Sequence, residues 1–478
     1  MDVLERLFKQ RFGARPLRVQ PVQGGLGGSG RTIVRLANAE HTAIGIQHDV
    51  AEENAAFLAY TRHFRAHVLP VPEIYAEDAA HGAYLEQDLG DTTLFQFLSR
   101  QRNGAEIAPE VVAAYRKVVE VLPRFQIEAA RDFDYKYCYP RDRFDRQSIA
   151  WDLNYFKYYF LRLAGVNFHE QALEEDFARL TKLLVSADCE YFLYRDFQSR
   201  NIMLCEGEPY FLDYQGGRRG ALQYDIASLL YDAKADLPPE LRSKLLDHYL
   251  EAVAKYTPLS REKFFETYYA YVYVRIMQAL GAYGFRGFYE RKEHFLQSVP
   301  YALRNLRWLL HNARLPVELP ALMAAFTDMV GSEKLHRVVQ PAAKAGELTV
   351  TVTSFSFHRG PVQDESGNGG GYVFDARALP NPGREERFKR LSGQDAEVVT
   401  YLESEDSVGR FLDHAMALIE ESVGNYRQRG FGHLSVSFGC TGGQHRSVYL
   451  AEQAAKRLSG RNGVQVVLRH REQENWVR

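Results

Sequence analysis

Hydrophobic and polar residues recur with different periods along the chain and divide it into three zones. In the first hundred residues, short runs at 31–36, 41–47 and 83–87 predict strands among helical stretches. From 105 to 335, apolar residues recur at three- and four-residue spacing, as in 110–122 and 271–283, which predicts helices. A run of predicted strands interrupts this helical zone at 191–214.

The third zone begins with a fresh alternating strand at 348–357. A second predicted strand at 433–439 leads through a glycine-containing turn into a helix at 445–458, and a last strand follows at 464–470. Strands that alternate with helices predict a small α/β domain. The loose stretch at 339–347 precedes it, so we expect domains at 1–338 and 348–478 joined by that linker.

The composition is that of an ordinary folded protein and narrows the choice of function. The 478 residues are 46% hydrophobic and 25% charged, which excludes bulk disorder. Lys and Arg number 59 against 61 Asp and Glu, so the net charge of −2 argues against a protein that coats nucleic acid or an acidic membrane. The four cysteines form no CxxC pair, and the sequence contains no signal peptide or membrane span, so we expect a cytoplasmic protein.

The strongest chemical signal is a set of oxygen-bearing side chains within 191–214. Asp196 is followed five residues later by Asn201, and Asp213 lies on the next predicted strand. Phosphoryl transfer to a hydroxyl needs a carboxylate that takes the proton, and an amide and a second carboxylate that hold Mg²⁺ on the phosphates. We therefore expect Asp196 to be the catalytic base, and Asn201 and Asp213 to be magnesium ligands; the alternative is a plain surface turn.

These residues lie in motifs that resemble the aminoglycoside phosphotransferase family of kinase-like enzymes. The matching segments, within about residues 5–335, are LYRDFQSRNIM, FLDYQGGRRG, YDIASLLYD and RIMQALGAYGF, and they look most like AmgK-type kinases of N-acetylmuramate and N-acetylglucosamine. The resemblance implies an α+β bilobal protein-kinase-like fold, with an N-lobe at about 1–90 and a helical C-lobe at about 91–338. It also implies ATP (or GTP) and Mg²⁺ as cofactors. Asp225 would support the catalytic loop from below, and a helix cap is the equal alternative.

Two upstream segments are candidates for binding the nucleotide. The glycine-rich stretch at 24–30 precedes a predicted strand, and such a loop lets backbone N–H groups approach phosphates closely. The residues predicted to do so are Gly25, Gly27, Gly28 and Ser29, with a simple linker as the alternative. By the same resemblance to kinases, the backbone from Gln87 to Leu89 is the hinge that meets the adenine.

The ion pair that grips phosphates in protein kinases is incomplete in this sequence. Asp49 and Glu52 fit a capping box that opens a helix, on which Glu52 or Glu53 would be the glutamate of that pair. The preceding strand at 41–47, where kinases place the lysine, contains none. We expect Gln47 or the backbone of the glycine-rich loop to substitute for it.

A candidate acceptor site lies on a predicted helix at 151–156. Asp152 and Asn154 would hydrogen-bond sugar hydroxyls while Trp151 stacks on the ring, and Arg195 is assigned to the same site. The alternative is an ordinary helix whose aromatic residues pack in the core and whose polar residues face water.

The segment from Phe438 to Ser447 is a second strong signal, placed between a predicted strand and a helix. Such a turn directs several N–H groups and the helix dipole to one point, which favours phosphate binding, and Arg446 would add a bidentate grip. Cys440 and Arg446 also have the C-x5-R spacing of cysteine phosphatases. We favour anion binding without covalent chemistry, because the sequence identifies no general-acid aspartate for the phosphatase reaction.

This last zone resembles the C-terminal domain of the RNase adapter protein RapZ. The matching segments, within about 348–473, are SFSFHRG, YVFDARALPNPG, GCTGGQHRSVYLAEQ and VLRHRE. The resemblance implies a phosphosugar-binding unit that drives homo-oligomerisation and contributes to RNA binding. The residues that it assigns to the phosphate are Gly442, Gly443, His445, Arg446 and Ser447, with Arg359, Arg377 and Asn381 facing the same pocket.

Together these features predict an ATP- and Mg²⁺-dependent kinase of a free amino sugar, phosphorylated at its anomeric hydroxyl and regulated by a phosphosugar at the C-terminal domain. One alternative is an RNA-binding regulator with a weak or inactive kinase half, for which the missing lysine is the reason. RNA binding is not favoured, because acidic and basic residues are balanced in the last domain. Another alternative is an aminoglycoside phosphotransferase, which predicts an acidic pocket for a polycation.

Overall fold

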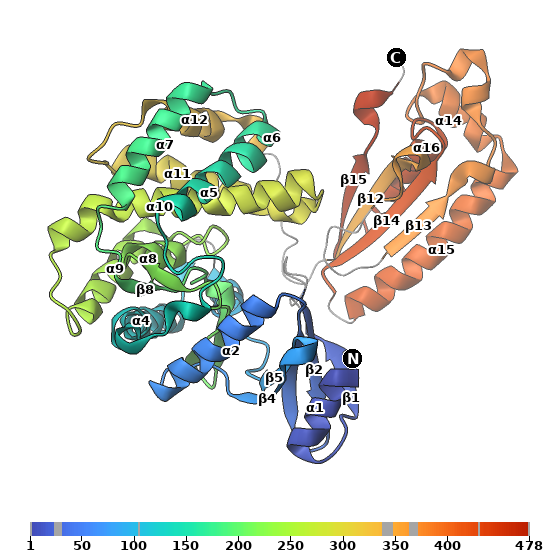
Figure 1. Ribbon diagram of the computed structural model, residues 1–478. Coiled ribbons are helices and arrows are strands. Elements are labelled where there is room, and N and C mark those ends of the chain that lie inside the picture. Colours follow the sequence, from blue (N-terminus) through green and yellow to red (C-terminus); the bar gives the residue numbers. More distant parts are fainter. Residues whose placement is uncertain are drawn as a thin grey trace. The chain divides into compact units, whose positions relative to one another are not determined.

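The structure is a computed structural model that describes residues 2–22, 31–103, 106–336, 348–362, 371–428 and 431–476. The chain forms two compact units, Met1–Val339 and Gln340–Arg478, which Figure 1 draws in blue to yellow and in orange to red. Each unit has hydrophobic core clusters of its own, so each is described by itself. The predicted linker at 339–347 lies outside the described residues.

The first unit begins with an antiparallel five-stranded sheet in the order β1-β2-β3-β5-β4. Its strands are β1 (Arg18–Pro21), β2 (Thr32–Ala37), β3 (Thr42–Gln47), β4 (Ile74–Asp78) and β5 (Ala83–Gln87), and its helices are α1 (Asp2–Phe12) and α2 (Ala51–Ala66). The strands predicted at 31–36, 41–47 and 83–87 are confirmed as β2, β3 and β5. Leu4, Leu7 and Phe8 of α1 pack with Leu36 and Leu85 of the sheet, which buries one face.

The start of α2 corrects one prediction. The helix begins at Ala51 after Val50, and no side chain caps its first turn, so Asp49 and Glu52 do not form a capping box. Asp49 lies one position too early, because it precedes the residue that adopts the N-cap conformation. Buried contacts of Phe57, Tyr60 and Phe64 hold the helix in place instead.

The rest of the first unit is mainly helical, as the three- and four-residue spacing predicted. Its helices are α3 (Leu94–Gln101), α4 (Pro109–Pro123), α5 (Arg146–Phe156), α6 (Arg162–Ala164), α7 (Glu170–Leu184), α8 (Gln223–Leu230), α9 (Pro239–Val253), α10 (Arg261–Gly284), α11 (Val299–Asn312), α12 (Pro320–Gly331) and α13 (Glu333–His336). Its short strands are β6 (Arg102–Asn103), β7 (Glu106–Ile107), β8 (Tyr191–Leu193), β9 (Ile202–Cys205), β10 (Glu208–Phe211) and β11 (Arg218–Gly220). The strand-rich interruption predicted at 191–214 is confirmed by β8, β9 and β10. Two small antiparallel pairs, β9–β10 and β8–β11, carry the loops of the candidate site; β9 contacts α3 and β10 contacts α4, while α8 packs on the long buried helix α10.

The second unit is a parallel sheet with helices packed on it, as strands alternating with helices predicted. Its strands, in spatial order, are β13 (Gly371–Asp375), β14 (His433–Cys440), β12 (Leu348–Ser356) and β15 (Val464–His470), and its helices are α14 (Ala396–Glu403), α15 (Asp406–Gln428) and α16 (Arg446–Leu458). Every residue of the central strand β12 is buried, which is typical of a parallel strand covered on both faces. Because β13, β14 and β12 run parallel, their carboxyl ends meet at one edge, where α/β sheets bind ligands.

Among the described helices, none combines the length and the apolar character needed to cross a membrane.

Candidate active site

The three side chains predicted for phosphoryl transfer come together between β8 and β11. Asp196 follows β8, Asn201 ends a short 3-10 helix, and Asp213 follows β10. The Asn201 amide nitrogen donates to the backbone oxygen of Asp196 at 2.8 Å and to Oδ2 of Asp213 at 3.1 Å. Because the nitrogen is anchored on the loop, the amide oxygen is the atom that remains for a metal ion. The side-chain oxygens of Asn201 and Asp213 are therefore of the kind that Mg²⁺ prefers.

The electrostatics of this cluster favour proton transfer. Burial, and next the negative charge of Asp213, raise the pKa of the Asp196 carboxyl. A raised pKa makes a carboxylate a better proton acceptor, as a general base requires. Asp213 has a backbone φ of +68°, in a region that side chains other than glycine rarely adopt, and this strain is typical of functional loops.

Asp225 holds the backbone of the catalytic loop. Its carboxylate accepts hydrogen bonds from the N–H groups of Tyr194 at 2.8 Å and Arg195 at 3.0 Å, and from the amide of Gln126 at 3.1 Å. The N-cap residue of α8 is Leu222, so the helix-cap alternative for Asp225 is wrong. Arg195 has a φ of +82°, and the two N–H bonds fix the loop in this strained conformation just before Asp196.

We expect Asp225→Asn to destabilise the first unit and to lower kcat together. The amide that replaces the carboxylate places an N–H donor against other donors, and each buried group left unsatisfied costs about 1–3 kcal/mol. Thermal melting and steady-state kinetics check this. Asp247→Asn is the matched control, because Asp247 is exposed and pairs with Arg261 at the surface. Unchanged melting and turnover in Asp225→Asn would contradict the supporting role.

Arg195 and Asp152 form a bidentate ion pair. The guanidinium nitrogens lie 2.8 Å and 2.7 Å from the two carboxylate oxygens, and Asp152 is 7% exposed. Its carboxylate is therefore engaged by Arg195. Asp152 and Asn154 also lie two positions apart on α5, where side chains point about 200° away from each other. Trp151 is 45% exposed. That Asp152 and Asn154 bind the sugar stays a prediction of the sequence.

Arginines surround the catalytic carboxylate. The positive charges of Arg275, Arg195 and Arg218 oppose the rise in the pKa of Asp196, which stays raised overall. Arg218 is nearly buried and donates to the backbone oxygens of Gly216 at 3.0 Å and Tyr139 at 3.2 Å, and burial lowers the pKa of its guanidinium. The sequence analysis did not single out Arg218, although it lies five residues after Asp213 in the motif. The neighbourhood of Asp196 is therefore rich in positive charge.

The predicted hinge lies at the end of β5. The N–H of Gln87 donates to the backbone oxygen of Glu73 at 2.8 Å, so this group is already used inside the N-lobe. Leu89 is buried. Asp88, between Gln87 and Leu89, accepts two hydrogen bonds from the guanidinium of Arg35, at 2.6 Å and 2.9 Å, which fixes this turn. The glycine-rich residues Gly25, Gly27, Gly28 and Ser29 lie outside the described residues.

An arginine that sequence reasoning missed lies next to the magnesium-ligand candidate. Nη2 of Arg31 is 2.6 Å from Oε2 of Glu53, and Nη1 is 3.4 Å from Oδ1 of Asp213. Glu53 rather than the exposed Glu52 is thus the α2 glutamate that points to the site. The amide of Gln47 donates instead to the backbone oxygen of His81, at 3.4 Å.

Glu86, on β5, is a buried acid whose titration makes the stability of the first unit depend on pH. Burial raises the pKa of its carboxyl from 4.5 to about 8, although the charge of Arg31 opposes the shift. Within the described part of the chain, its Oε2 has no hydrogen-bond partner. The folded state therefore binds the proton more tightly than the unfolded chain does between pH 4.5 and about pH 8.

We expect this group to make the first unit less stable as pH rises from 4.5 to 8, by up to about 1.4 kcal/mol per pH unit. The loss is complete above the folded pKa, because the group is then ionised in both states. Melting temperatures of the natural chain and of Glu86→Gln across this range measure the effect. The difference between the two curves should change steadily with pH, and parallel curves would show that Glu86 does not titrate in this window.

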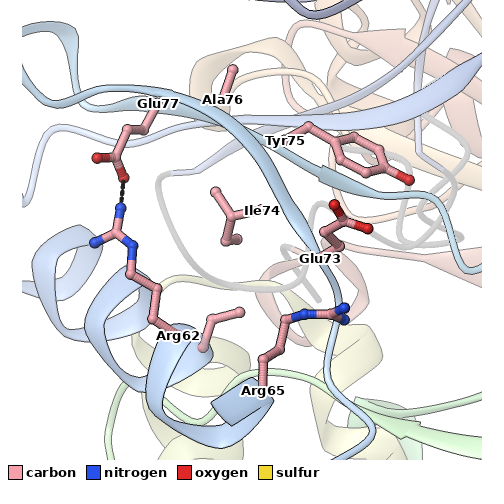
Figure 2. A pocket seen from close by; sticks show the side chains of 8 residues that line it. Arg62, Arg65, Glu73, Ile74, Tyr75, Ala76 and Glu77 are labelled. Atoms are coloured by element: carbon pink, nitrogen blue, oxygen red, sulfur yellow. Dashed lines mark hydrogen bonds and ion pairs between the residues drawn. The ribbon is translucent and has the colours of Figure 1, made fainter. Parts of the chain in front are cut away.

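A cavity of about 480 Å³ lies elsewhere on the N-lobe, between α2 and β4 (Figure 2). Its lining is Thr61, Arg62, Arg65, Glu73, Ile74, Tyr75, Ala76 and Glu77. Arg62 pairs with Glu77, and Nη1 of Arg65 donates to the backbone oxygen of Val71 at 3.2 Å. None of the predicted site residues lines this cavity, and its two arginines already have partners on the N-lobe.

The loop between β14 and α16 is the predicted anion site of the second unit. Gly443 has a φ of +74°, and a Cβ there would lie 2.6 Å from the side chain of Glu472 and 3.0 Å from the backbone nitrogen of Ser356, so glycine is required. The N–H of Gly443 donates to Sγ of Cys440 at 3.2 Å, and Oγ of the buried Ser447 lies 3.1 Å from that sulfur. Gly442, by contrast, has open space around it.

Arg446 contributes to this loop in an unexpected way. It is 4% exposed, and its Nη1 donates to the backbone oxygens of Arg377 at 2.9 Å and Leu379 at 3.0 Å. Burial lowers the pKa of its guanidinium and of the neighbouring imidazole of His445, which contacts the backbone oxygen of Phe388 at 2.9 Å. Arg446 thus holds the segment after β13 against the loop through Nη1. This nitrogen is therefore already engaged and is not free for a bidentate contact with phosphate.

The structure brings the other predicted anion-site residues to the same edge of the sheet. Arg377, half exposed, pairs with Asp375 at 2.6 Å, and Arg359, also exposed, lies 3.2 Å from the buried Glu472 that contacts the Gly443 region. The side chain of Asn381 accepts from the N–H of Gly383, which lies against His445. Cys440 is 2% exposed, which does not favour the attacking sulfur of the phosphatase alternative.

Comparison with known proteins agrees with this division of the chain. The family model described as "Phosphotransferase enzyme family" matches residues 22–260, which is half of the chain. The model described as "RapZ C-terminal domain" matches residues 348–474. The family resemblances and the fold class predicted from the motifs, a bilobal kinase-like domain followed by a small α/β domain, are thereby confirmed.

Individual proteins resemble parts of the chain. A nucleotide-binding protein of Dinoroseobacter shibae is 43% identical over 125 residues, which are 26% of this chain and 40% of that protein. One of Acidovorax ebreus is 37% identical over 173 residues, 35% of this chain and 58% of that protein. The chain thus spans about half the length of these relatives. The solved structure of a choline kinase from Streptococcus pneumoniae has 14% identity and a TM-score of 0.41, and covers 65% of this chain and 99% of that one.

The chain therefore belongs to the phosphotransferase enzyme family and carries a RapZ C-terminal domain after its kinase-like domain.

Proposed function

We propose that this phosphotransferase uses ATP and Mg²⁺ to phosphorylate the anomeric hydroxyl of a free amino sugar, of the N-acetylglucosamine or N-acetylmuramate type. The observation that carries the proposal is the convergence of Asp196, Asn201 and Asp213 through the two hydrogen bonds of Asn201. The AmgK-type resemblance of the surrounding motifs supplies the class of sugar.

Each residue of the cluster has a role that follows from its position. Asp196 accepts the proton of the acceptor hydroxyl as that oxygen attacks the terminal phosphorus, and the bond between this phosphorus and the bridging oxygen of the nucleotide breaks. Asn201 and Asp213 hold the metal through oxygen atoms. Mg²⁺, when bound, neutralises charge on the phosphate oxygens. Asp225 keeps the loop before Asp196 in the strained conformation that aims the base.

The charges around the cluster support a neutral or anionic acceptor. Arg275 and Arg218 lie near Asp196, and Arg195 and Asp152 neutralise each other as an ion pair. A polycationic aminoglycoside needs exposed carboxylates in its pocket, whereas a sugar with a carboxylate side arm is attracted by nearby guanidinium groups. These contacts favour the amino-sugar acceptor over the aminoglycoside alternative.

A screen of acceptors tests the proposal. The purified chain is incubated with labelled ATP and Mg²⁺, and with N-acetylglucosamine, N-acetylmuramate, glucose or kanamycin. We expect transfer to an N-acetylated amino sugar, with a product whose phosphate is coupled to the anomeric proton in NMR spectra. Transfer to kanamycin alone, or to a hydroxyl other than the anomeric one, would contradict the proposal.

For the second unit we propose the binding of a phosphosugar, which would regulate the kinase. The glycine-required turn at Gly443 and the start of α16 at the carboxyl end of β14 support it, because the first N–H groups of a helix favour anions. Calorimetric titration of the whole chain with glucosamine 6-phosphate tests this, and an absence of binding heat at several temperatures would contradict it. Assembly into a homo-oligomer through this unit, a cytoplasmic location and RNA binding remain predictions of the sequence.

A further inference from the structure

The N-lobe places an arginine beside the candidate magnesium ligand Asp213. Arg31 is the residue directly before β2, at the end of the segment that joins β1 to β2. Its side chain is 12% exposed, and it lies between Glu53 of α2 and Asp213 of the C-lobe. One arginine therefore links the helix of the N-lobe to the candidate magnesium ligand.

The two contacts of Arg31 differ in strength. The contact with Glu53 is short, at 2.6 Å, and its geometry is that of a charge-assisted hydrogen bond. The contact with Asp213 is long, at 3.4 Å. Within the described residues, the buried Nε of Arg31 has no hydrogen-bond partner. Glu53 thus anchors Nη2 of the guanidinium, while Nη1 keeps hydrogen-bonding capacity on the side that faces Asp213.

The surroundings of Arg31 keep the side chain charged and in place. Asp213, Tyr84 and Glu53 stabilise its positive charge, which raises the pKa of the guanidinium despite burial. Glu86 faces it from β5, and His48 lies 3.4 Å from the same oxygen of Glu53. Strand β3 contributes no lysine, and Gln47 at its end is directed to His81. Of the two substitutes considered from the sequence, the Gln47 side chain is therefore not placed for this task.

We propose that Arg31 is the phosphate-gripping cation of this kinase, held by Glu53 in the way that a strand lysine is held by a helix glutamate in protein kinases. The inference rests on the proposed function, because it requires a nucleotide whose metal is held by Asp213. A metal on Asp213 competes for the carboxylate that Arg31 contacts, and this leaves Nη1 for a phosphate oxygen. A guanidinium suits this task because it stays charged and its planar group can donate to Glu53 and to a phosphate from different nitrogens.

The proposal predicts a loss of affinity that depends on the phosphates of the ligand. We expect Arg31→Ala to weaken binding of ADP and ATP by about 10- to 100-fold and to leave adenosine within about twofold. Arg31→Lys should retain part of the affinity, because it keeps the charge but not the separate nitrogens that contact Glu53 and the phosphate. Glu53→Gln should weaken ADP binding less than Arg31→Ala does, because the cation stays but its anchor is lost.

Calorimetric titrations of the whole chain with ATP, ADP and adenosine, with and without Mg²⁺, measure these affinities without any turnover. Arg62→Ala is the matched control, since Arg62 is an arginine of the same lobe that pairs with a glutamate at the surface, as Figure 2 shows. Gln47→Ala tests the rival residue and should leave all three affinities unchanged.

The outcomes separate this role from the function itself. If Arg31→Ala binds ADP as the natural chain does, or weakens adenosine equally, Arg31 does not grip phosphate, although the kinase function stands. If Gln47→Ala weakens ADP and Arg31→Ala does not, the role belongs to Gln47. If the natural chain binds neither ATP nor ADP, the proposed function fails and this inference fails with it. A melting curve of Arg31→Ala like that of the natural chain excludes unfolding as the cause of a loss.

Discussion

Asp196→Asn is expected to lower kcat by about 100- to 10,000-fold and to leave the affinity for ATP within about twofold. Asparagine has nearly the same shape as aspartate but cannot take the proton of the acceptor hydroxyl. The raised pKa of Asp196, caused first by burial and next by the charge of Asp213, makes this carboxylate a suitable base in the natural chain. Steady-state phosphorylation of N-acetylglucosamine gives kcat, and calorimetry with ATP gives the affinity.

The exposed control Asp247→Asn should behave as the natural chain does in both assays. A parallel fall of kcat and ATP affinity would instead show that Asp196 serves nucleotide binding. Turnover of Asp196→Asn close to that of the natural chain would show that another group, or solvent, accepts the proton.

Asp213→Ala is expected to raise the Mg²⁺ concentration needed for half-maximal activity at least about tenfold and to lower kcat by about 100-fold or more. The reason is that, in the proposed site, Asp213 supplies the carboxylate that holds the metal, while Asn201 supplies only a neutral oxygen. Activity measured over a range of Mg²⁺ concentrations gives both quantities. ATP binding without Mg²⁺ should change much less than binding with it.

The dependence on Mg²⁺ distinguishes metal binding from the contact that Asp213 makes with Arg31. If Asp213 served only to hold Arg31, its removal would change ATP affinity equally with and without Mg²⁺. Gln215→Ala is a matched control, because Gln215 donates to the same carboxylate at 2.6 Å but is not a predicted metal ligand. An unchanged Mg²⁺ dependence in Asp213→Ala would contradict the assignment.

The local part of the site could be predicted from the sequence because its residues are close along the chain. Asp196 and Asn201 share one loop, and Asp213 follows a tight strand pair, so residue spacing alone brings them together. The sequence left two interpretations of Asp225, support of the loop before Asp196 or a helix cap. Its contacts with the N–H groups of Tyr194 and Arg195 favour the first.

The distant part of the site could not be predicted, because periodicity does not report long-range contacts. Arg31 is separated from Asp213 by 182 positions, and no local pattern connects them. A glycine-rich segment directly before Arg31 was the one available signal. In the second unit, Nη1 of Arg446 donates to backbone oxygens about 70 positions away, at Arg377 and Leu379, and no local pattern indicates these contacts.

Helix geometry explains one remaining difference. The predicted capping box failed because the first turn of α2 starts one residue later than Asp49 requires, and helix ends are uncertain by one or two positions in any sequence pattern. The bidentate pair of Asp152 with Arg195 joins residues 43 positions apart, so no local pattern could indicate it. In the case of α2 the type of element was correct and its first residue was not.

A crystal structure of the chain with a non-hydrolysable ATP analogue, Mg²⁺ and N-acetylglucosamine tests the central claim most directly. We expect a metal ion bound by the side-chain oxygens of Asn201 and Asp213, and the anomeric hydroxyl of the sugar within hydrogen-bonding distance of Asp196. A nucleotide bound away from these three side chains, or a metal ion that contacts neither Asn201 nor Asp213, would contradict it.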